Sequence, residues 1–299
     1  MARVLCLGEA LVDLICERPV DGLAAADVFV PHFGGAVSNV AVFAARAGAS
    51  VALAGGAGDD AWGAWLRDRL VAEGVDVSLF TLRPGLQTPV AAVAVSSGGE
   101  ASYAIYGDAI GSIVDALGEQ ASDAVAGSAA LFLSSNTLVG AKEREVSMRA
   151  RETALSLERP VLFDPNLRLH RWTSRADAAA SANACVPGAL LVRCNAFEAS
   201  VMTGEDDPER AASALVKAGA RLVVITLGPE GALLRGEQRA DVKGVPVEVR
   251  STIGAGDAVT GLLLARLALA GFYPSAAAAA LPDAMAAGAA ACERWGALE

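Results

Sequence analysis

Histidine is almost missing from this chain of 299 residues, and the cysteines are few and far apart. The two histidines are His32 and His170, and the five cysteines form no Cys-x-x-Cys pair. Zinc sites and disulfide ladders need such residues at short spacings, so the sequence predicts neither. Isolated thiols are typical of reduced cytosolic proteins, and we therefore expect a cytoplasmic protein.

Positive charge is also scarce. The chain has 24 Lys and Arg against 34 Asp and Glu, a net charge of −10 and a pI near 4.8. Proteins that bind nucleic acid or anionic membranes depend on clustered cations, so we expect neither partner. Long apolar runs are missing too: Glu9 and Asp13 interrupt the N-terminal run, and Arg266, Pro282 and Asp283 interrupt the Ala-rich C-terminal region. The sequence therefore predicts no targeting peptide and no membrane helix.

Two further absences limit the fold and the chemistry. Aromatic residues make up only 5% of the chain while 54% is hydrophobic, so the core has to be built mainly from Ala, Val and Leu. This composition suits close packing of helices on a sheet and excludes a disordered chain. No Gly-Lys-Ser or Gly-Lys-Thr sequence occurs, which excludes a Walker-type nucleotide site.

Short apolar runs alternate with longer stretches of helical periodicity along most of the chain. The runs predict strands at residues 3–7, 51–54, 129–133, 161–163, 190–194 and 222–226. The stretches predict helices over 37–47, 61–73, 142–157, 208–218, 258–270 and 274–290. Such alternation is typical of the α/β class, with a mostly parallel central sheet and helices on both faces. No linker divides the chain, so we expect a single domain over residues 1–299.

Residues 14–33 and 90–106 do not fit this alternation. In the second segment, Ser-Ser-Gly-Gly-Glu at 96–100 separates two short apolar runs, which is typical of a β-hairpin. We expect the two segments to form a small β lid that stands off the main sheet and closes over a substrate. An antiparallel edge of the main sheet is the alternative. The exposed edges of such a lid favour a homodimer in which two lids cover each other.

The sequence Thr-Ile-Gly-Ala-Gly-Asp at 252–257 leads directly into a predicted helix. The backbone N–H groups of Gly254, Ala255, Gly256 and Asp257 would converge at the positive end of the helix dipole, where a phosphate or a developing anion binds. Asp257 could cap the helix, as Asp at a helix start usually does. It could instead take a proton from a hydroxyl that attacks a phosphoryl group held by those amides.

A second pair of glycines and the polar residues near it suggest a sugar site. Gly34 and Gly35 precede another predicted helix and allow a ligand to come close to the backbone. Asn39, one turn into that helix, offers a donor and an acceptor to a sugar hydroxyl, although a structural asparagine explains it as well. Asp13 is the better of two carboxylates after the first strand for accepting two neighbouring hydroxyls, and Glu9 is the other.

Gly-Gly-Ala-x-x-Asn-x-Ala at 34–41 together with Thr-Ile-Gly-Ala-Gly-Asp at 252–257 resembles the ribokinase-like (PfkB) family of carbohydrate kinases. The likeness extends over nearly the whole chain, with further family-like runs at 58–60, 164–168, 195–198 and 226–231. It implies transfer of a phosphoryl group from ATP to a sugar hydroxyl. In that reaction Asp257 would be the base, and the anion hole would be formed by Gly254, Ala255, Gly256 and Asp257. The implied sugar ligands are Asp13, Gly34, Gly35 and Asn39.

The resemblance also implies a nucleotide site and a magnesium ion. Asn195 and Glu198 would organise Mg²⁺, with Glu198 acting through water, although the same pair is typical of a helix N-cap and its capping partner. Ser251 stands where the family often has an Asp beside a monovalent-cation site, so we do not expect potassium dependence. The implied nucleotide-binding residues are Asn195, Thr226, Gly228 and Gly231, with the small residues Ala287, Gly288 and Ala291 near the adenine.

The identity of the sugar rests on fewer residues. The runs at 8–13 and 164–168 are most similar to fructokinases and 2-keto-3-deoxygluconate kinases. Acid-sugar members of the family tend to carry an arginine after the lid tyrosine, whereas Tyr106 is followed here by Gly107 and Asp108. We therefore expect fructose, with Tyr103 and Arg168 among the residues that bind it. Kinases of 2-keto-3-deoxygluconate and of ribose are the alternatives.

Two other classes of protein compete with this interpretation. Residues 56–61 satisfy the Gly-x-Gly-x-x-Ala fingerprint of dinucleotide sites, so an NAD-dependent dehydrogenase is the rival enzyme. Against it, Asp59 and Asp60 would lie where the pyrophosphate charge belongs. A non-catalytic sugar-binding protein is the third class, and it would have no need of Asp257.

Overall fold

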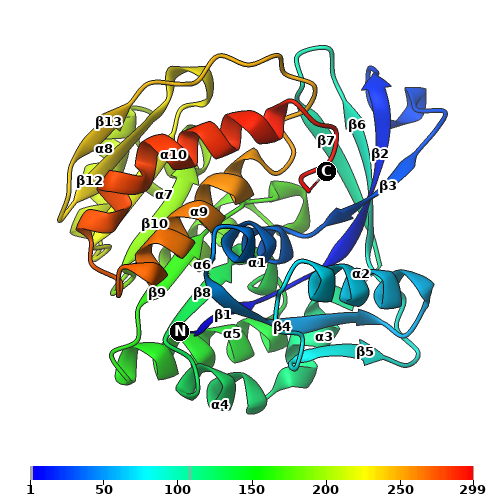
Figure 1. Ribbon diagram of the computed structural model, residues 1–299, viewed down its shortest axis with the longest axis horizontal. Helices are drawn as coiled ribbons and strands as arrows, with labels where there is room; N and C mark the ends of the chain where they lie inside the picture. The colour runs from blue at the N-terminus through cyan, green and yellow to red at the C-terminus, as the bar shows by residue number, and fades with distance from the viewer. Residues whose placement is uncertain (1–2, 108, 299) are drawn as a thin grey trace.

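A computed structural model describes residues 3–107 and 109–298, and within them a sheet of nine strands runs through the protein (Figure 1). Its order is β13-β12-β11-β10-β9-β8-β1-β4-β5, and all neighbours from β11 to β5 are parallel. The hairpin β12–β13 adds an antiparallel edge that the sequence did not predict. The strands are β1 (Arg3–Leu7), β4 (Ser50–Gly58), β5 (Phe80–Arg83), β8 (Ala130–Ser134), β9 (Val161–Asp164), β10 (Leu191–Asn195), β11 (Leu222–Thr226), β12 (Ala232–Gly236) and β13 (Ala240–Val242).

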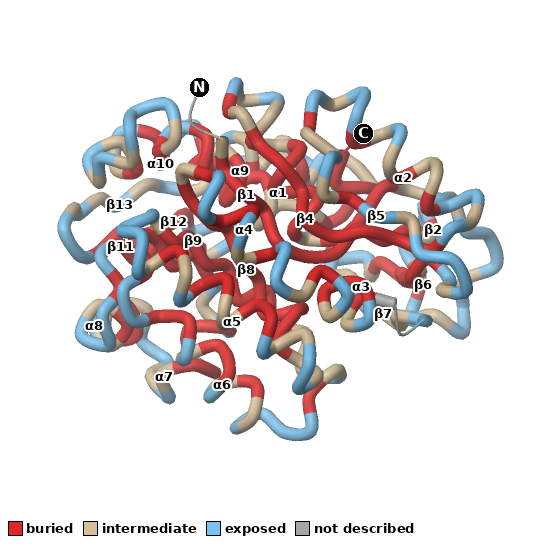
Figure 2. The backbone as a smooth tube through the Cα atoms, turned by 90° about the horizontal axis from the view of Figure 1, so that it is seen from below, coloured by how far each residue is buried: buried red, intermediate tan, exposed pale blue. Residues whose placement is uncertain are grey.

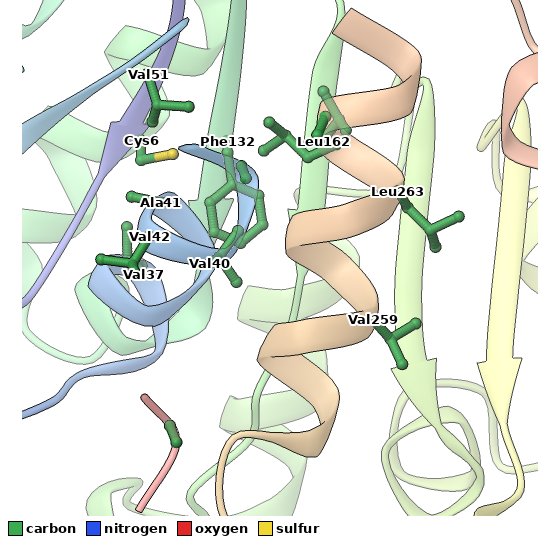
Figure 3. Close-up of a cluster of buried hydrophobic side chains, with 14 of the residues drawn as sticks. Cys6, Val37, Val40, Ala41, Val42, Val51, Phe132, Leu162, Val259 and Leu263 are labelled. Atoms are coloured by element: carbon green, nitrogen blue, oxygen red, sulfur yellow. The ribbon is translucent and has the colours of Figure 1, made fainter. Parts of the chain in front are cut away.

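Helices cover both faces of this sheet, because successive strand residues point to opposite sides. In β1, Val4 and Cys6 join one core cluster, while Leu5 and Leu7 join the other. Figure 3 shows part of the first cluster, where α1 and α9 pack on the strands. The first face is covered by α1 (Ala36–Arg46), α2 (Ala61–Ala72), α9 (Ala255–Leu269) and α10 (Ser275–Cys292); the second by α3 (Ala109–Leu117), α4 (Gln120–Ala126), α5 (Ala141–Ser156), α6 (Arg175–Asn183), α7 (Ala196–Thr203) and α8 (Pro208–Lys217).

A second, smaller sheet stands beside the central one (Figure 1). Its order is β3-β2-β6-β7, with β2 (Leu11–Pro19), β3 (Val30–Gly34), β6 (Val90–Val95) and β7 (Ala101–Tyr106). The predicted hairpin is present as β6–β7, and β2 begins three residues earlier than expected. The predicted α/β fold, with a mostly parallel central sheet and a small additional sheet, is confirmed. Movement of the small sheet over a ligand stays a prediction.

The last helix, α10, is long and apolar enough to cross a membrane by length and composition alone. Pro282 and Asp283 were expected to rule out a membrane span here, but by length and composition they do not. In the fold, α10 packs along α9 and buries Leu281 and Ala284 in the first core cluster. Figure 2 shows the buried residues gathered on the central strands and the exposed ones on outer helical turns and loops. The apolar side of α10 is therefore used within the protein.

The strand order reverses next to β1, which has β4 on one side and β8 on the other. The chain first moves outward through β4 and β5 and later returns to build β8 to β13 on the opposite side. In open α/β sheets, ligands bind at such a reversal, outside the carboxyl ends of the strands. The segments that follow β1 and β8 are therefore placed to form a binding site.

Candidate active site

A cavity lies at this reversal, between the central sheet and the small sheet. We call it the carboxylate cavity, because Glu9, Asp13 and Asp257 all line it. From the small sheet it is lined by Leu11, Asp13, Ala91, Tyr103 and Ile105. The rest of its lining is Glu9, Gly35, Ala36, Asn39, Asn136, Asn166, Arg168, Ile253, Gly254 and Asp257. Segments far apart in the sequence thus bring most of the predicted sugar-binding residues together.

The N-terminus of α9 faces this cavity without a side-chain cap among the described residues. Its N-cap is Gly254, at a φ of 76°, a left-handed conformation that glycine adopts readily. Asp257 is the third residue of the helix and makes no capping bond among the described residues. Asp257 is therefore not an ordinary helix cap. The first amides of a helix have no intrahelical acceptor, which leaves this end able to bind an anion.

The carboxylate of Asp257 is held by a residue 218 positions away. Asn39 Nδ2 donates a hydrogen bond of 2.8 Å to Asp257 Oδ2. Burial raises the pKa of Asp257 to about 7, while the Asn39 bond lowers it and the charge of Asp164 raises it further. A carboxyl group with a pKa near neutrality is suited to accept a proton from a hydroxyl.

Two buried oxygens in the cavity have no hydrogen-bond partner among the described residues: Asn39 Oδ1 and Glu9 Oε2. Both residues are only 3% exposed. The other oxygen of Glu9 accepts from the amide of Ala36, at the start of α1, and from Asn136 Nδ2, at 3.0 and 2.8 Å. Buried polar atoms are almost always paired, so the two open acceptors mark where ligand hydroxyls would donate.

Asp13 reaches the cavity from the small sheet. The residue is 4% exposed, and a Cβ on Gly34 would collide with its carboxylate. Gly34 therefore makes room for Asp13 and not directly for a ligand, whereas Gly35 lines the cavity itself. Burial raises the pKa of Asp13 to about 7; Arg168 lowers it, and the charges of Asp257 and Glu9 raise it.

Arg168 is the cation of the carboxylate cavity. Its guanidinium carbon lies 4.9 Å from the centre of the Tyr103 ring, so the two side chains stack across the boundary between the sheets. Both residues line the cavity in which we expect the sugar to bind, and their contact with a sugar stays a prediction.

A second cavity of about 550 Å³ lies on the other side of the α9 N-terminus. We call it the apolar cavity, since Val245, Val249 and Met285 contribute to its wall. Ala255 and Gly256 also line it, so the first turn of α9 separates the two cavities. Three of the predicted nucleotide-binding residues line it: Thr226, Gly228 and Gly288.

The remaining predicted nucleotide-binding residues lie elsewhere. Asn195 lines a neighbouring pocket together with Thr226 and Gly228. The lining of the apolar cavity does not include Gly231, Ala287 or Ala291 among the described residues. A Cβ on Gly231 would collide with the Val242 carbonyl, so close packing against the edge hairpin accounts for this glycine.

Asn195 and Glu198 form a capping box at the start of α7. Asn195 Oδ1 accepts from the Glu198 amide at 2.8 Å, and Glu198 Oε2 accepts from the Asn195 amide at 2.9 Å. Glu198 Oε1 accepts from the Leu167 amide at 2.8 Å. Within residues 3–107 and 109–298, no group of three or more His, Cys, Asp or Glu is arranged to hold a metal ion. Asn195 and Glu198 are therefore a helix N-cap and its capping partner, and their role at a metal stays a prediction.

Several polar residues of the site were not singled out from the sequence. Asn136 and Asn166 line the carboxylate cavity. Asp164 Oδ2 accepts from Arg193 Nη1 at 3.1 Å and from Thr260 Oγ1 at 2.6 Å. Asn136, Asp164 and Asn166 lie at or just beyond the carboxyl end of a parallel strand, and that position was the signal available in the sequence. Arg193 and Thr260 lie inside β10 and α9, where no such signal exists.

The turn that satisfies the dinucleotide fingerprint has a different use. Asp60 is the N-cap of α2 and accepts from the Gly63 amide at 2.9 Å. Its carboxylate also accepts from the amide and the hydroxyl of Thr88, at 2.8 and 2.7 Å. A carboxylate thus occupies the position that a pyrophosphate needs, which removes the support for a dehydrogenase.

Comparison with known proteins decides the family. The family model described as pfkB family carbohydrate kinase matches residues 1–299. The chain belongs to this family. This carbohydrate kinase is 30% identical over 266 residues to fructokinase-1 of Oryza sativa subsp. japonica, covering 88% of this chain and 82% of the relative.

Solved structures agree with the assignment. The fructokinase of Vibrio cholerae O395, in a form with fructose, ADP and calcium bound, has a TM-score of 0.85 and 29% identity to this kinase, covering 100% of this chain and 95% of the other. The aminoimidazole riboside kinase of Salmonella enterica has a TM-score of 0.82 and 26% identity, with 99% and 95% covered. The chain is therefore a phosphotransferase that acts on an alcohol group of a carbohydrate.

The activity of this kinase is expected to rise with pH through about 7. Asp257 accepts a proton only when ionised, and its pKa near 7 leaves most of it protonated under acid conditions. The pKa of Asp13 lies in the same range, and Asp13 is the expected carboxylate ligand of the sugar. The slope of the acidic limb of log kcat/KM against pH should therefore exceed one. Measuring kcat/KM between about pH 5 and 9 checks both the rise and its slope.

The variant Asn39→Ala provides the matching control for that profile. Because the Asn39 hydrogen bond lowers the pKa of Asp257, its loss should move the acidic limb to higher pH. A wild-type profile that stays flat down to about pH 5, or one that Asn39→Ala leaves in place, contradicts the assignment of Asp257 as the titrating base.

Proposed function

We propose that this kinase transfers the γ-phosphoryl group of ATP to a hydroxyl of fructose. The observation that carries the proposal is the placement of Asp257 at the uncapped N-terminus of α9, between the carboxylate cavity and the apolar cavity. The carboxylate cavity suits a sugar, and the apolar cavity suits an adenine nucleotide. The shared wall is then the place where the γ-phosphoryl group and the hydroxyl meet.

The chemistry needs few groups, since phosphoryl transfer depends mainly on alignment and charge neutralisation. The sugar hydroxyl gives its proton to Asp257 as its oxygen forms a bond to phosphorus. The bond from phosphorus to the bridging oxygen breaks, and its electron pair leaves with ADP. The amides of Gly256 and Asp257 at the helix N-terminus stabilise the charge on the transferred group.

The charges of the carboxylate cavity favour a neutral sugar. Three carboxyl groups, Glu9, Asp13 and Asp257, line it against the single guanidinium of Arg168. An acid sugar would add a fourth carboxyl group to a site in which burial already disfavours the charged forms of Asp13 and Asp257. Tyr106 is followed by Gly107, and the next position, Asp108, lies outside the described residues. Fructose is bound in the related Vibrio structure and is our first candidate.

A second candidate substrate, 2-keto-3-deoxygluconate, is favoured by one observation. Arg168 stacks on Tyr103 with its guanidinium in the cavity, a position from which it could pair with a substrate carboxylate. The comparison of these two sugars is therefore the sharpest test of specificity.

Magnesium would accompany the nucleotide. Mg²⁺ keeps several of its waters and takes few protein ligands, so it does not require a dense carboxylate cluster. Glu198 uses one lone pair of each oxygen for a backbone amide, which leaves others to accept from metal-bound water. The ion, when bound, supplies positive charge to the phosphates. Asn195, which lines a pocket with Thr226 and Gly228, would help to orient the ion and its waters.

The small sheet would act as a lid. Leu11, Asp13, Ala91, Tyr103 and Ile105 of this sheet line the carboxylate cavity, so the sheet would cover one side of a bound sugar. The outer strands of the small sheet, β3 and β7, pair with no further strand among the described residues, and an equivalent sheet of a second copy would cover them. We expect a homodimer in the cytoplasm, and a monomeric mass in light scattering would contradict the dimer.

A coupled assay of ADP release tests the proposed function. The sugars to compare are fructose, 2-keto-3-deoxygluconate and ribose, each with ATP and Mg²⁺. We expect the largest kcat/KM with fructose. Preference for 2-keto-3-deoxygluconate would reassign the substrate, and the absence of turnover with fructose would refute the proposed function.

A further inference from the structure

A buried arginine beneath the first turn of α9 plays no part in the reaction proposed above. Arg193 lies in β10 and is 8% exposed. Its Nη1 donates to Asp164 Oδ2 at 3.1 Å, and its Nη2 donates to Thr226 Oγ1 at 2.8 Å. These two bonds come from the ends of the neighbouring strands β9 and β11, so they fix the guanidinium below the helix N-terminus.

The guanidinium also touches the anion-binding turn itself. A Cβ on Gly256 would collide with Nη1, Nη2 and Cζ of Arg193, so the glycine allows the two groups to approach closely. Arg193, Ala255 and Gly256 together line the apolar cavity. The cation therefore borders the volume that the nucleotide would occupy, next to the amides that would hold its terminal phosphate.

The electrostatics of this position call for an anion. The N-terminus of a helix carries partial positive charge, so a cation placed against it is unfavourable when nothing negative lies between them. The carboxylates of Asp164 and Glu198 offset part of this charge. Asp164 also accepts from Thr260 and from the Asn166 amide, and Glu198 accepts from two backbone amides. In addition, Arg193 Nε is buried with no hydrogen-bond partner among the described residues.

Another arginine shows what a purely structural ion pair looks like in this protein. Arg235, on β12, is 7% exposed. Its Nε and Nη2 donate to the carboxylates of Glu209 and Asp241, and its Nη1 donates to two carbonyls. All three nitrogens of Arg235 are therefore used, whereas Arg193 keeps donors in reserve beside a cavity.

We propose that Arg193 is a catalytic residue, whose guanidinium donates hydrogen bonds to the phosphoryl group as it passes from ATP to the sugar. As the bond from phosphorus to the sugar oxygen forms and the bond to ADP breaks, negative charge on the transferred oxygens lies between Arg193 and the α9 amides. The proton still goes to Asp257 and the electron pair to ADP. The inference rests on the proposed placement of the phosphates at α9.

The test compares Arg193→Ala with the matched variant Arg235→Ala. We expect Arg193→Ala to lower kcat by about 100-fold or more, the range seen when one donor to a transition-state anion is removed. The dissociation constant for ADP, measured by calorimetry, should change only a few-fold. Guanidinium ion added at millimolar concentration should restore part of the activity of Arg193→Ala, which a loss of structure would not permit. Arg235→Ala should keep kcat near wild type and gain nothing from guanidinium.

Arg193→Lys keeps the charge and provides a second variant if Arg193→Ala does not fold. We expect it to fold and to lower kcat by about tenfold, because Lys cannot reproduce the planar fork of donors. The inference is overturned if Arg193→Lys, and Arg193→Ala where it folds, keep kcat within about twofold of wild type. That result would leave the proposed function intact, whereas a wild-type enzyme that phosphorylates no sugar would refute the proposed function itself.

Discussion

Replacing Asp257 with Asn is expected to lower kcat by about 10³- to 10⁴-fold, the upper range of general base catalysis. The geometry should survive, because the amide oxygen of Asn can still accept from Asn39 Nδ2. What the variant loses is the ability to take the proton of the sugar hydroxyl. Initial rates at saturating ATP and sugar measure the effect.

The matched control is Asp177→Asn. Asp177 is also the third residue of its helix, α6, and it lines neither the carboxylate cavity nor the apolar cavity. We expect this variant to keep wild-type kcat. Nucleotide binding should be unchanged in both variants, and an Asp257→Asn enzyme with an undiminished rate would require another base.

The Asp257→Asn substitution should also stabilise the ligand-free enzyme near neutral pH. The folded pKa of Asp257 is raised to about 7, so the folded state holds its proton more strongly than the unfolded chain. Stability therefore falls as pH rises between the ordinary carboxyl pKa and about 7, and an uncharged Asn avoids this loss. A higher melting temperature with lower activity separates a catalytic carboxylate from a structural one.

Replacing Asp13 with Asn is expected to lower kcat/KM for the sugar by about 100-fold or more. A carboxylate that accepts from two hydroxyls makes two charge-assisted hydrogen bonds, each worth about 1.5–3 kcal/mol, and about 1.4 kcal/mol corresponds to a factor of ten. The loss should appear mainly in KM for the sugar, and KM for ATP should stay near wild type. Steady-state kinetics with each substrate varied in turn make this measurement.

Glu17→Gln is the control on the same strand. Glu17 lies on β2 with Asp13, but its Oε1 pairs with His32 Nε2 at 2.9 Å, away from the lining of the carboxylate cavity. We expect it to leave KM for the sugar unchanged. Equal losses for the two variants would mean that the small sheet was disturbed as a whole and that Asp13 is no specific ligand.

The central sheet was predictable because its signal is local. Strands such as β1 and β11 are buried along almost their whole length, so each reads as a continuous apolar run. The edge strands β12 and β13 were missed, since they are short and the charged residues Arg235 and Asp241 interrupt their apolar runs. The short helices α4 and α6 were missed for a similar reason: Ala and Ser dominate them and give little periodicity.

The site was predictable only in part, because its decisive contacts join distant segments. The sequence placed Asp257 at a helix start and Asn39 in another helix, but nothing local shows that they bond to each other. Gly34 could be identified as a position of close approach, yet the group that approaches is Asp13 and not a ligand. Arg193 lies inside an apolar strand, and only the fold shows that it lies below Gly256.

A crystal structure with fructose and a non-hydrolysable ATP analogue bound tests the central claim most directly. We predict that one sugar hydroxyl lies about 2.6–3.2 Å from a carboxylate oxygen of Asp257, with the terminal phosphate on the α9 amides. A complex in which the Asp257 carboxylate turns away from the sugar, or in which the phosphates bind elsewhere, would contradict the account.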